Sequence, residues 1–342
     1  MAAFTGPAAE LGKRMQTGMQ AYFAAVNAQG GVNGRRIKLI SRDDGYEPET
    51  TTAAAKALVA TDKMFAIAGT VGTPTGLALL PIVHEANVPV VGMFTGAQAL
   101  REPLNRNLFH VRASYYDETE RIVEHLFNLG LKKIAVFYQT DAYGKAGLQG
   151  VERAMTRRGQ TPVALATVER DSTDMAKALE KILAAKPDAV VQISAYRSCA
   201  ALIKEAHSRK FAGQFFNVSF VGSNALSAEL GDEGRGVVIS QVVPSPYRAL
   251  TPVAREYQQH MTAAGEKAFD FVSFEGHLSA RVLVEGLRRA GQFPTRETLV
   301  AGLETMRNFS LGGYVVSFSP NSHEGSHLVD LTMIGKGGRF IY

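Results

Sequence analysis

The stretch from Gly69 to Thr75 reads GTVGTPT, and its residue types suit the binding of a small anion. It follows an apolar run, and Pro74 predicts that a helix begins here because proline is favoured in the first helical turn. Backbone N–H groups at such a helix start, together with the helix dipole and the Thr73 hydroxyl, favour a carboxylate. The alternative is that Thr73 only caps the helix. Thr73 is therefore a candidate carboxylate ligand, with the capping role left open.

A second pattern, His323-Glu-Gly-Ser-His327, spells the H-E-x-x-H motif of zinc peptidases. That motif binds zinc because a helix places both histidines on one face. Here Pro320 precedes the motif and Gly325 interrupts it, which predicts a turn between strands 313–318 and 328–334. No segment that would supply a third ligand is evident. We therefore expect neither peptidase activity nor a metal or other cofactor.

The composition is that of an ordinary soluble globular protein. A chain of 342 residues exceeds one ordinary core and predicts two lobes. Its 46% hydrophobic and 20% charged residues argue against both disorder and membrane insertion. The net charge of +5 does not indicate a nucleic-acid partner, because Lys and Arg are spread along the chain among acidic residues. The single cysteine, Cys199, excludes an internal disulfide and is interpreted as a buried structural thiol.

Residues 5–44 predict a turn, an amphipathic helix, a glycine-rich turn and a buried strand in close succession. The helix is expected over 8–28, and its apolar residues recur at helical spacing: Leu11, Met15, Met19, Tyr22, Phe23 and Val26. Gly30, Gly31 and Gly34 end it, because glycine tolerates the positive φ of turns. The strand is expected over 35–42 and ends at the charged pair Asp43 and Asp44.

The rest of the chain alternates strands and helices, which predicts parallel sheets covered by helices on both faces. The first lobe has expected strands at 35–42, 64–69, 88–93 and 107–111 and expected helices at 8–28, 48–60, 73–86 and from 251 onward. The second lobe has expected strands at 133–138, 162–167, 188–192, 216–221 and 236–240 and expected helices at 117–129, 142–158, 172–184 and 196–208. The uncharged stretch 64–83 is interpreted as strand, turn and helix, because Pro74 and Pro81 interrupt it.

From Thr5 to the C-terminus the chain resembles the Leu/Ile/Val-type solute-binding proteins of ABC transporters, which have the type I periplasmic binding protein fold. The Thr5-Gly6-Pro7 turn and the elements that follow it carry this resemblance. It implies an α/β protein with two doubly wound parallel-sheet lobes joined by a three-crossing hinge. The implied lobes are 1–117 with 248–318 and 118–247 with 319–342, and the implied crossings lie near Asp117, Tyr247 and Phe318.

The resemblance also implies a ligand site at the loops that follow the strands. Val71, Gly72 and Thr73 would hold the ligand's carboxylate. The loop over 94–98 would add backbone and hydroxyl contacts from Thr95, Gly96 and Ala97. In the second lobe, Tyr143 and Tyr196 each follow a strand and would close on the ligand, although packing at the rim is the alternative for both. The remaining implied site residues are Leu11, Ser223, Asn224 and Phe274.

Two positions depart from the family's pattern. Amino-acid binders usually place an acidic residue in the loop over 222–225 to pair with the ligand's ammonium, and here Asn224 stands there. An amide supplies no counter-charge, and a buried unpaired ammonium is costly. Either Glu275 or another carboxylate replaces the acidic residue, or the ligand is not an α-amino acid. Leu11 takes the place of an aromatic residue, which leaves that wall aliphatic. Arg112 lies near the first crossing, where it could belong to the pocket wall or to the hinge, and the sequence assigns it to neither.

These observations favour a non-catalytic periplasmic receptor that captures a small aliphatic amino acid or related carboxylate between two lobes. Its closed form would be recognised by the membrane permease subunits of an ABC transporter. Met1 lies just before the first turn, so we expect a signal peptide and the start of the first strand to precede it. The alternative is a cytoplasmic ligand-sensing regulator of the same fold, with an amide or amino-acid effector and a partner protein or RNA. An upstream start encoding a signal peptide would favour the receptor, and a true start at Met1 the regulator.

Overall fold

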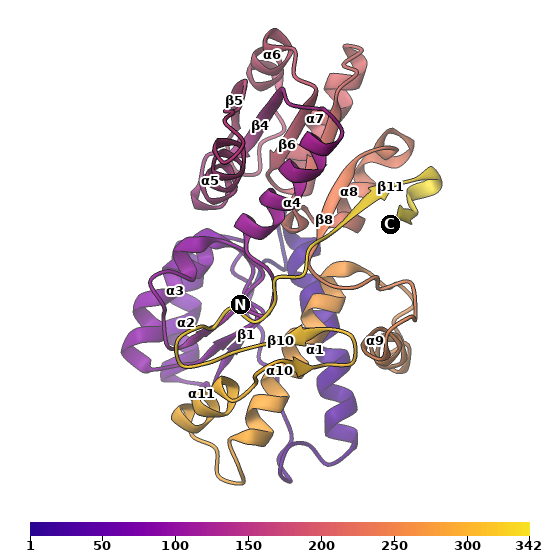
Figure 1. Ribbon diagram of the computed structural model, residues 1–342. Coiled ribbons are helices and arrows are strands. Elements are labelled where there is room, and N and C mark those ends of the chain that lie inside the picture. The colour runs from indigo at the N-terminus through magenta and orange to yellow at the C-terminus, as the bar shows by residue number, and fades with distance from the viewer. The chain divides into compact units, whose positions relative to one another are not determined.

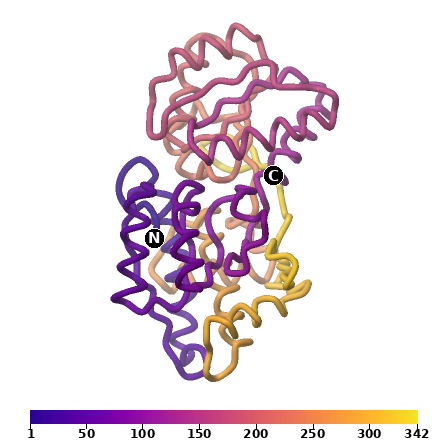
Figure 2. The backbone as a smooth tube through the Cα atoms, turned by 90° about the vertical axis from the view of Figure 1, so that its left-hand side faces the viewer, coloured from indigo at the N-terminus to yellow at the C-terminus, as the bar shows by residue number.

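The computed structural model describes residues 1–342, and the chain divides into two compact units. Unit 1 comprises Met1–Thr95, Ala99–Ala113 and Val243–His327, and unit 2 comprises Gly96–Gln98, Ser114–Val242 and Leu328–Tyr342. The yellow C-terminal residues follow the orange helices of unit 1 and return to unit 2 (Figure 1, Figure 2). The chain therefore passes between the units at 113–114, 242–243 and 327–328, apart from the short excursion over 96–98.

The segment over 319–327, which the sequence placed in the second lobe, belongs to unit 1. Its backbone pairs with the residue that follows strand β3 (Leu108–Phe109): the N–H of His110 donates to the carbonyl of His323 at 2.9 Å. The N–H of Gly325 donates to the carbonyl of His110 at 2.7 Å. These bonds add the segment to the sheet of unit 1, which sequence pattern alone did not reveal.

The sheet of unit 1 has three parallel strands in the order β1-β2-β3, where β1 is Ile67–Ala68 and β2 is Val90–Val91. Ile67 pairs with Val90, which in turn pairs with Leu108. The helices of this unit are α1 (Ala9–Ala28), α2 (Pro48–Ala60), α3 (Thr73–Ala86), α9 (Pro252–Ala263), α10 (Phe271–Arg289) and α11 (Arg296–Glu304). A short antiparallel pair, β9 (Phe309–Ser310) and β10 (Val315–Val316), completes it. The predictions of helices over 48–60 and 73–86 are confirmed at both ends.

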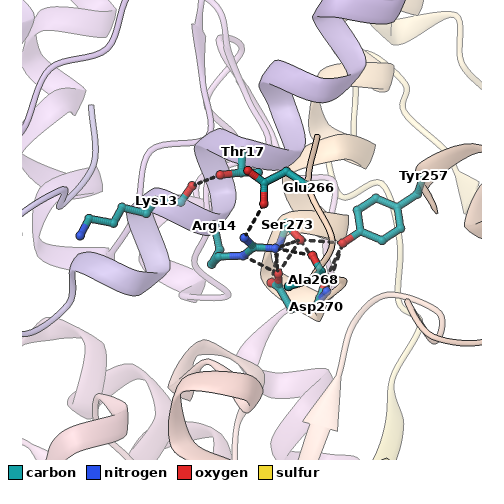
Figure 3. A network of polar contacts seen from close by, with 8 residues as sticks. All are labelled: Lys13, Arg14, Thr17, Tyr257, Glu266, Ala268, Asp270 and Ser273. Atoms are coloured by element: carbon teal, nitrogen blue, oxygen red, sulfur yellow. Dashed lines mark hydrogen bonds and ion pairs between the residues drawn. The ribbon is translucent and has the colours of Figure 1, made fainter. Parts of the chain in front are cut away.

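Helices α1 and α10 lie side by side in unit 1 (Figure 1). A Cβ atom on Gly18 would lie 1.7 Å from the carbonyl oxygen of Ser273, so only glycine permits this approach of the backbones. At the same contact, Arg14 of α1 donates from Nε to Oδ2 of Asp270 at 2.6 Å, and Asp270 is the N-cap of α10 (Figure 3). The carbonyl of Ala268 accepts a further bond from Arg14 at 2.7 Å. This network anchors the start of α10, the helix that carries Phe274 and Glu275.

The prediction of a strand over 35–42 is wrong. The neighbouring Asp43 pairs with Ala2, and the side-chain amide of Asn27 bonds both the N–H and the carbonyl of Ile37, but no strand forms over this segment. Between the segment and residues 61–69 lies a cavity of about 710 Å³. A strand is defined by a ladder of hydrogen bonds to a neighbouring strand, and residues 36–42 form no such ladder.

Unit 2 contains a seven-stranded sheet in the order β12-β11-β8-β7-β6-β4-β5. Its strands are β4 (Ile134–Gln139), β5 (Ala164–Val168), β6 (Ala189–Ile193), β7 (Gln214–Asn217), β8 (Val238–Gln241), β11 (Asp330–Ile334) and β12 (Phe340–Ile341). The strands from β8 to β5 run parallel, whereas β11 and β12 are antiparallel additions at one edge. The helices are α4 (Tyr115–Asn128), α5 (Ala142–Thr156), α6 (Ala176–Ala185), α7 (Tyr196–Ser208) and α8 (Ser223–Leu230).

The expected strand over 216–221 ends early, at Asn217. The N–H of Ser219 donates to Oε2 of the buried Glu118 at 2.7 Å, and residues Ser219–Val221 form a 3₁₀ turn. A backbone N–H that bonds a side chain is not available to a neighbouring strand. In neither unit does a helix combine the length and the apolar character needed to span a membrane.

Candidate ligand-binding site

In unit 1, two loops lie side by side beyond the carboxyl ends of β1 and β2. The N–H of Phe94 donates to the carbonyl of Thr70 at 2.7 Å, and the N–H of Gly72 donates to the carbonyl of Phe94 at 3.2 Å. Val71 and Phe94 therefore pair in parallel, as an extension of the sheet. The structure thus brings together two of the loops that the sequence predicted for the site.

The hydroxyls of Thr73 and Thr95 meet at 2.6 Å, and both side chains are buried. Thr73 is the first residue of α3, Gly72 precedes it as the N-cap, and no side chain caps the helix. The capping role left open for Thr73 is therefore wrong, because its hydroxyl bonds Thr95. The backbone N–H groups of the first turn remain a positively polarised group next to two hydroxyls, which is an arrangement that binds a carboxylate.

Tyr46 also lies at this helix start, and neither it nor Asp44, which bonds it, was predicted as a site residue. A Cβ atom on Gly72 would lie 2.2 Å from Cε2 of Tyr46, so the absence of a side chain at Gly72, which has a φ of 107°, lets the tyrosine ring pack there. The N–H of Tyr46 donates to Oδ1 of Asp44 at 2.9 Å. Burial raises the pKa of Asp44. The one signal in the sequence was the acidic pair that follows the apolar segment over 35–42.

A buried ion pair lies in the same unit. Arg112 and Glu275 are both buried, and Nη1 of Arg112 lies 3.5 Å from Oε1 of Glu275. The guanidinium also lies over the ring of Phe94, 5.2 Å from its centroid. Glu275 was the candidate partner for a ligand ammonium, and here its charge is balanced by Arg112. Sequence pattern could not join these residues, because 163 positions separate them (275 − 112).

Leu11 and Phe274 are buried in α1 and α10. The ring of Phe274 stacks on that of Tyr257 in α9, with the centroids 4.5 Å apart. The structure therefore gives Phe274 a clear packing role between α9 and α10. No hydrogen bond or ring contact joins either residue to the Thr73 and Thr95 pair.

In unit 2, the predicted site residues Gly96 and Tyr143 meet through Tyr115. The N–H of Tyr115 donates to the carbonyl of Gly96 at 2.7 Å, and its ring centroid lies 5.5 Å from that of Tyr143. Tyr143 also packs on Phe220, at a centroid distance of 4.4 Å. Asp141 caps α5 by accepting the N–H of Tyr143, which fixes the position of this tyrosine. Gly96, Tyr115, Tyr143 and Phe220 thus form one cluster with three aromatic rings.

The other predicted residues of unit 2 lie at separate strand ends. Tyr196 is the first residue of α7 and is buried, and Ala97 is buried in the segment over 96–98. Ser223 begins α8 and accepts a bond from Nε2 of Gln241 at 2.9 Å. Asn224, the next residue of α8, is half-buried. Gln241 was not predicted, and its only signal was its place at the end of an expected strand.

The remaining motifs have structural roles. His323 and His327 do not share a helix, and the ring of His323 stacks on Phe109 at 3.9 Å and bonds the carbonyl of Leu108. The predicted turn is found at Pro320 and Asn321, between the paired Ser319 and Ser322, and the motif that follows lies alongside His110 instead. Cys199 is buried as expected, donates to the carbonyl of Ser194, and has its pKa raised by burial.

Comparison with known proteins places this geometry in a family. The family model described as "Periplasmic binding protein" matches residues 1–339. A structure of a possible leucine/isoleucine/valine-binding protein from Rhodopirellula baltica is 34% identical, with a TM-score of 0.95 over 100% of this chain and 94% of that chain.

A substrate-binding periplasmic protein from Ralstonia solanacearum is 32% identical, with a TM-score of 0.94 over 99% and 98% of the two chains. The Leu/Ile/Val-binding protein homolog 3 of Brucella melitensis is 24% identical over 297 residues, which cover 85% of this chain and 78% of the relative. These relatives are ligand-binding proteins, not enzymes. The chain belongs to the type I periplasmic binding protein family, and it is a solute-binding receptor.

Proposed function

We propose that this protein is the extracytoplasmic receptor of an ABC importer, and that it delivers a small aliphatic amino acid or a related carboxylate to membrane permease subunits. The observation that carries the proposal is the start of α3, where uncapped backbone N–H groups lie beside the hydroxyl pair of Thr73 and Thr95. The names of relatives from Brucella melitensis and Rhodopirellula baltica refer to leucine, isoleucine and valine, which supports this ligand class.

Two ligands fit this proposal, an amino acid and a carboxylate without an amine, and they differ in their second polar group. Asn224 is neutral, and the carboxylate of Glu275 is engaged by Arg112. A buried ammonium without a counter-charge costs several kcal/mol, on the order of the affinity of a small ligand. A carboxylate without an amine therefore remains the alternative ligand within the same class.

The role of Thr73 is tested by isothermal titration calorimetry with the ligand extracted from the purified protein. Thr73→Ala should weaken binding by about 1–2 kcal/mol, because it removes a hydrogen bond to a charged group. Thr73→Ser keeps the hydroxyl and should retain most of the affinity. Thr52→Ala, which removes a similar hydroxyl from α2, serves as the matched control. An unchanged dissociation constant in Thr73→Ala would remove this residue from the site.

A thermal-shift screen tests whether the ligand carries an amine. Leucine, isoleucine and valine are compared with their 2-oxo acids and with simple carboxylates of the same carbon skeleton. Stabilisation by the amino acids alone would mean that a group other than Asn224 reads the ammonium. Equal or greater stabilisation by the compounds without an amine would overturn the amino-acid assignment and support the carboxylate.

A further inference from the structure

Three potential metal ligands converge on the contact between α9 and α10 in unit 1. Glu256 and His260 lie four residues apart on α9, and therefore on the same face of that helix. His277 of α10 faces them, and Nδ1 of His260 lies 3.0 Å from Nε2 of His277. One ligand atom from each of the three residues lies within 4.8 Å of the others.

The spacing of the two helices is fixed one turn before these histidines. The hydroxyl of Tyr257 in α9 lies 2.7 Å from Oγ of Ser273 in α10 (Figure 3). The ring of Tyr22, from α1, packs edge-on against His277 at a centroid distance of 4.9 Å. The two imidazoles are therefore held in place by contacts that involve neither of their facing nitrogens.

The protonation of the two rings suits metal binding. His277 is fully buried and its Nδ1 has no hydrogen-bond partner, and burial lowers its pKa well below the usual value. Burial also lowers the pKa of His260. Two neutral imidazoles that face each other share one proton between their nitrogens. A metal can replace that proton, because the half-exposed His260 can carry its proton on Nε2 instead.

We propose that Glu256, His260 and His277 bind a divalent transition metal, with Zn²⁺ as the ion to test. Zinc binds imidazole nitrogens at about 2.0–2.1 Å in tetrahedral geometry, which places two nitrogen ligands about 3.3 Å apart. The observed 3.0 Å needs an opening of only a few tenths of an ångström. A cavity of about 180 Å³, lined by Glu256 and His260, adjoins the cluster and has room for a water as the fourth ligand.

The positive charge of Arg281 repels a divalent cation and therefore limits the affinity of the site for the metal. Its Nη1 pairs with Oε2 of Glu256 at 2.5 Å and donates to the carbonyl of Leu311 at 2.7 Å. A guanidinium beside the carboxylate repels a divalent cation, so the affinity of the unaltered protein should be modest. Removing this charge should tighten binding, which a purely structural role of the three ligands would not predict.

The test is titration of the metal-stripped, tag-free protein with ZnCl₂, followed by calorimetry and elemental analysis. We expect one zinc per chain, at least a tenfold loss of affinity in Glu256→Gln and in His260→Ala, and a gain of at least threefold in Arg281→Gln. His84→Ala removes an exposed histidine and should change nothing.

Cobalt titration gives a second readout, because d–d absorption bands of tetrahedral cobalt should appear in the parent and be lost in His260→Ala. The proposal is overturned if the parent binds no zinc, or if Glu256→Gln and His260→Ala bind it as tightly as the parent. Neither result would bear on the ligand proposed for the Thr73 loop, because the zinc site is read without that ligand.

Discussion

The two units present different chemistry at the ends of their parallel strands. Unit 1 has an uncapped helix start, a hydroxyl pair and the buried ion pair of Arg112 and Glu275. Unit 2 has neutral amides at the corresponding ends of its strands, namely Gln139, Gln192, Asn217 and Gln241, and the aromatic cluster around Tyr143. The comparison shows that a buried ion pair and a hydroxyl pair distinguish unit 1, whereas buried amides and packed aromatic rings distinguish unit 2.

The largest effect on the difference between the units is expected when the guanidinium charge of Arg112 is removed from unit 1. Arg112→Met removes the guanidinium that pairs with the buried carboxylate of Glu275, and we expect a loss of about 3–5 kcal/mol in the free energy of unfolding. Urea denaturation measures it. The double variant Arg112→Met with Glu275→Gln should recover much of the loss. A loss below about 1 kcal/mol in the single variant would mean that the pair has no such role.

Lowering the pH should destabilise unit 1 more than unit 2. The histidines whose pKa is lowered, His110, His260, His277 and His323, all lie in this unit. In the unfolded chain such a histidine binds a proton below about pH 6.5, whereas the folded form resists it, so stability is present above that pH and falls as the pH is lowered. The loss is about 1.4 kcal/mol per pH unit for each fully buried histidine.

Hydrogen exchange compared near pH 7.5 and pH 5.5 tests this expectation, after correction for intrinsic rates. Protection of β3 and α10 should fall more than protection of β6. Equal loss in the two units would contradict the expectation, and so would a greater loss in unit 2.

The smallest effect is expected at a neutral hydrogen bond of unit 2. Ser223→Ala removes the acceptor of Gln241, but Gln241 also donates to Thr332 at 2.8 Å. We therefore expect a loss of about 0.5–1.5 kcal/mol in unfolding free energy, as for an ordinary hydrogen bond. A loss as large as that of Arg112→Met would show that charge is not what distinguishes the two units.

The local elements could be predicted where chemistry close in sequence decides them. The helices over 48–60 and 73–86 begin with proline in the first turn, and their apolar residues face the core. The strand expected over 35–42 does not form, because an apolar segment becomes a strand only when it bonds a neighbouring strand, and that partner cannot be predicted from the segment itself. The strand expected over 216–221 ended early because Glu118, about a hundred residues away, takes the N–H of Ser219.

The candidate site, like the fold, could be predicted only in part from the sequence. The sequence indicated Thr73 because it follows an expected strand, where ligands bind in α/β proteins, and the resemblance to a known family added Tyr143 and Ser223. It did not indicate that Thr73 would bond Thr95, or that Tyr115 and Phe220 would pack around Tyr143. Nor did it show that Glu275 would meet Arg112.

The sequence by itself determined the α/β class, the two-lobed organisation expected of the family, most helices and the loops that carry the candidate site. Local spacing is sufficient for the class and the helices, because helices, turns and caps depend on neighbours within a few residues, whereas the lobes and most of the site loops came from the resemblance to a known family. The tertiary structure alone decided which hydroxyls pair, which charges are balanced and where His260 and His277 meet. Those contacts join residues up to 163 positions apart (275 − 112), and only the folded backbone brings such residues together.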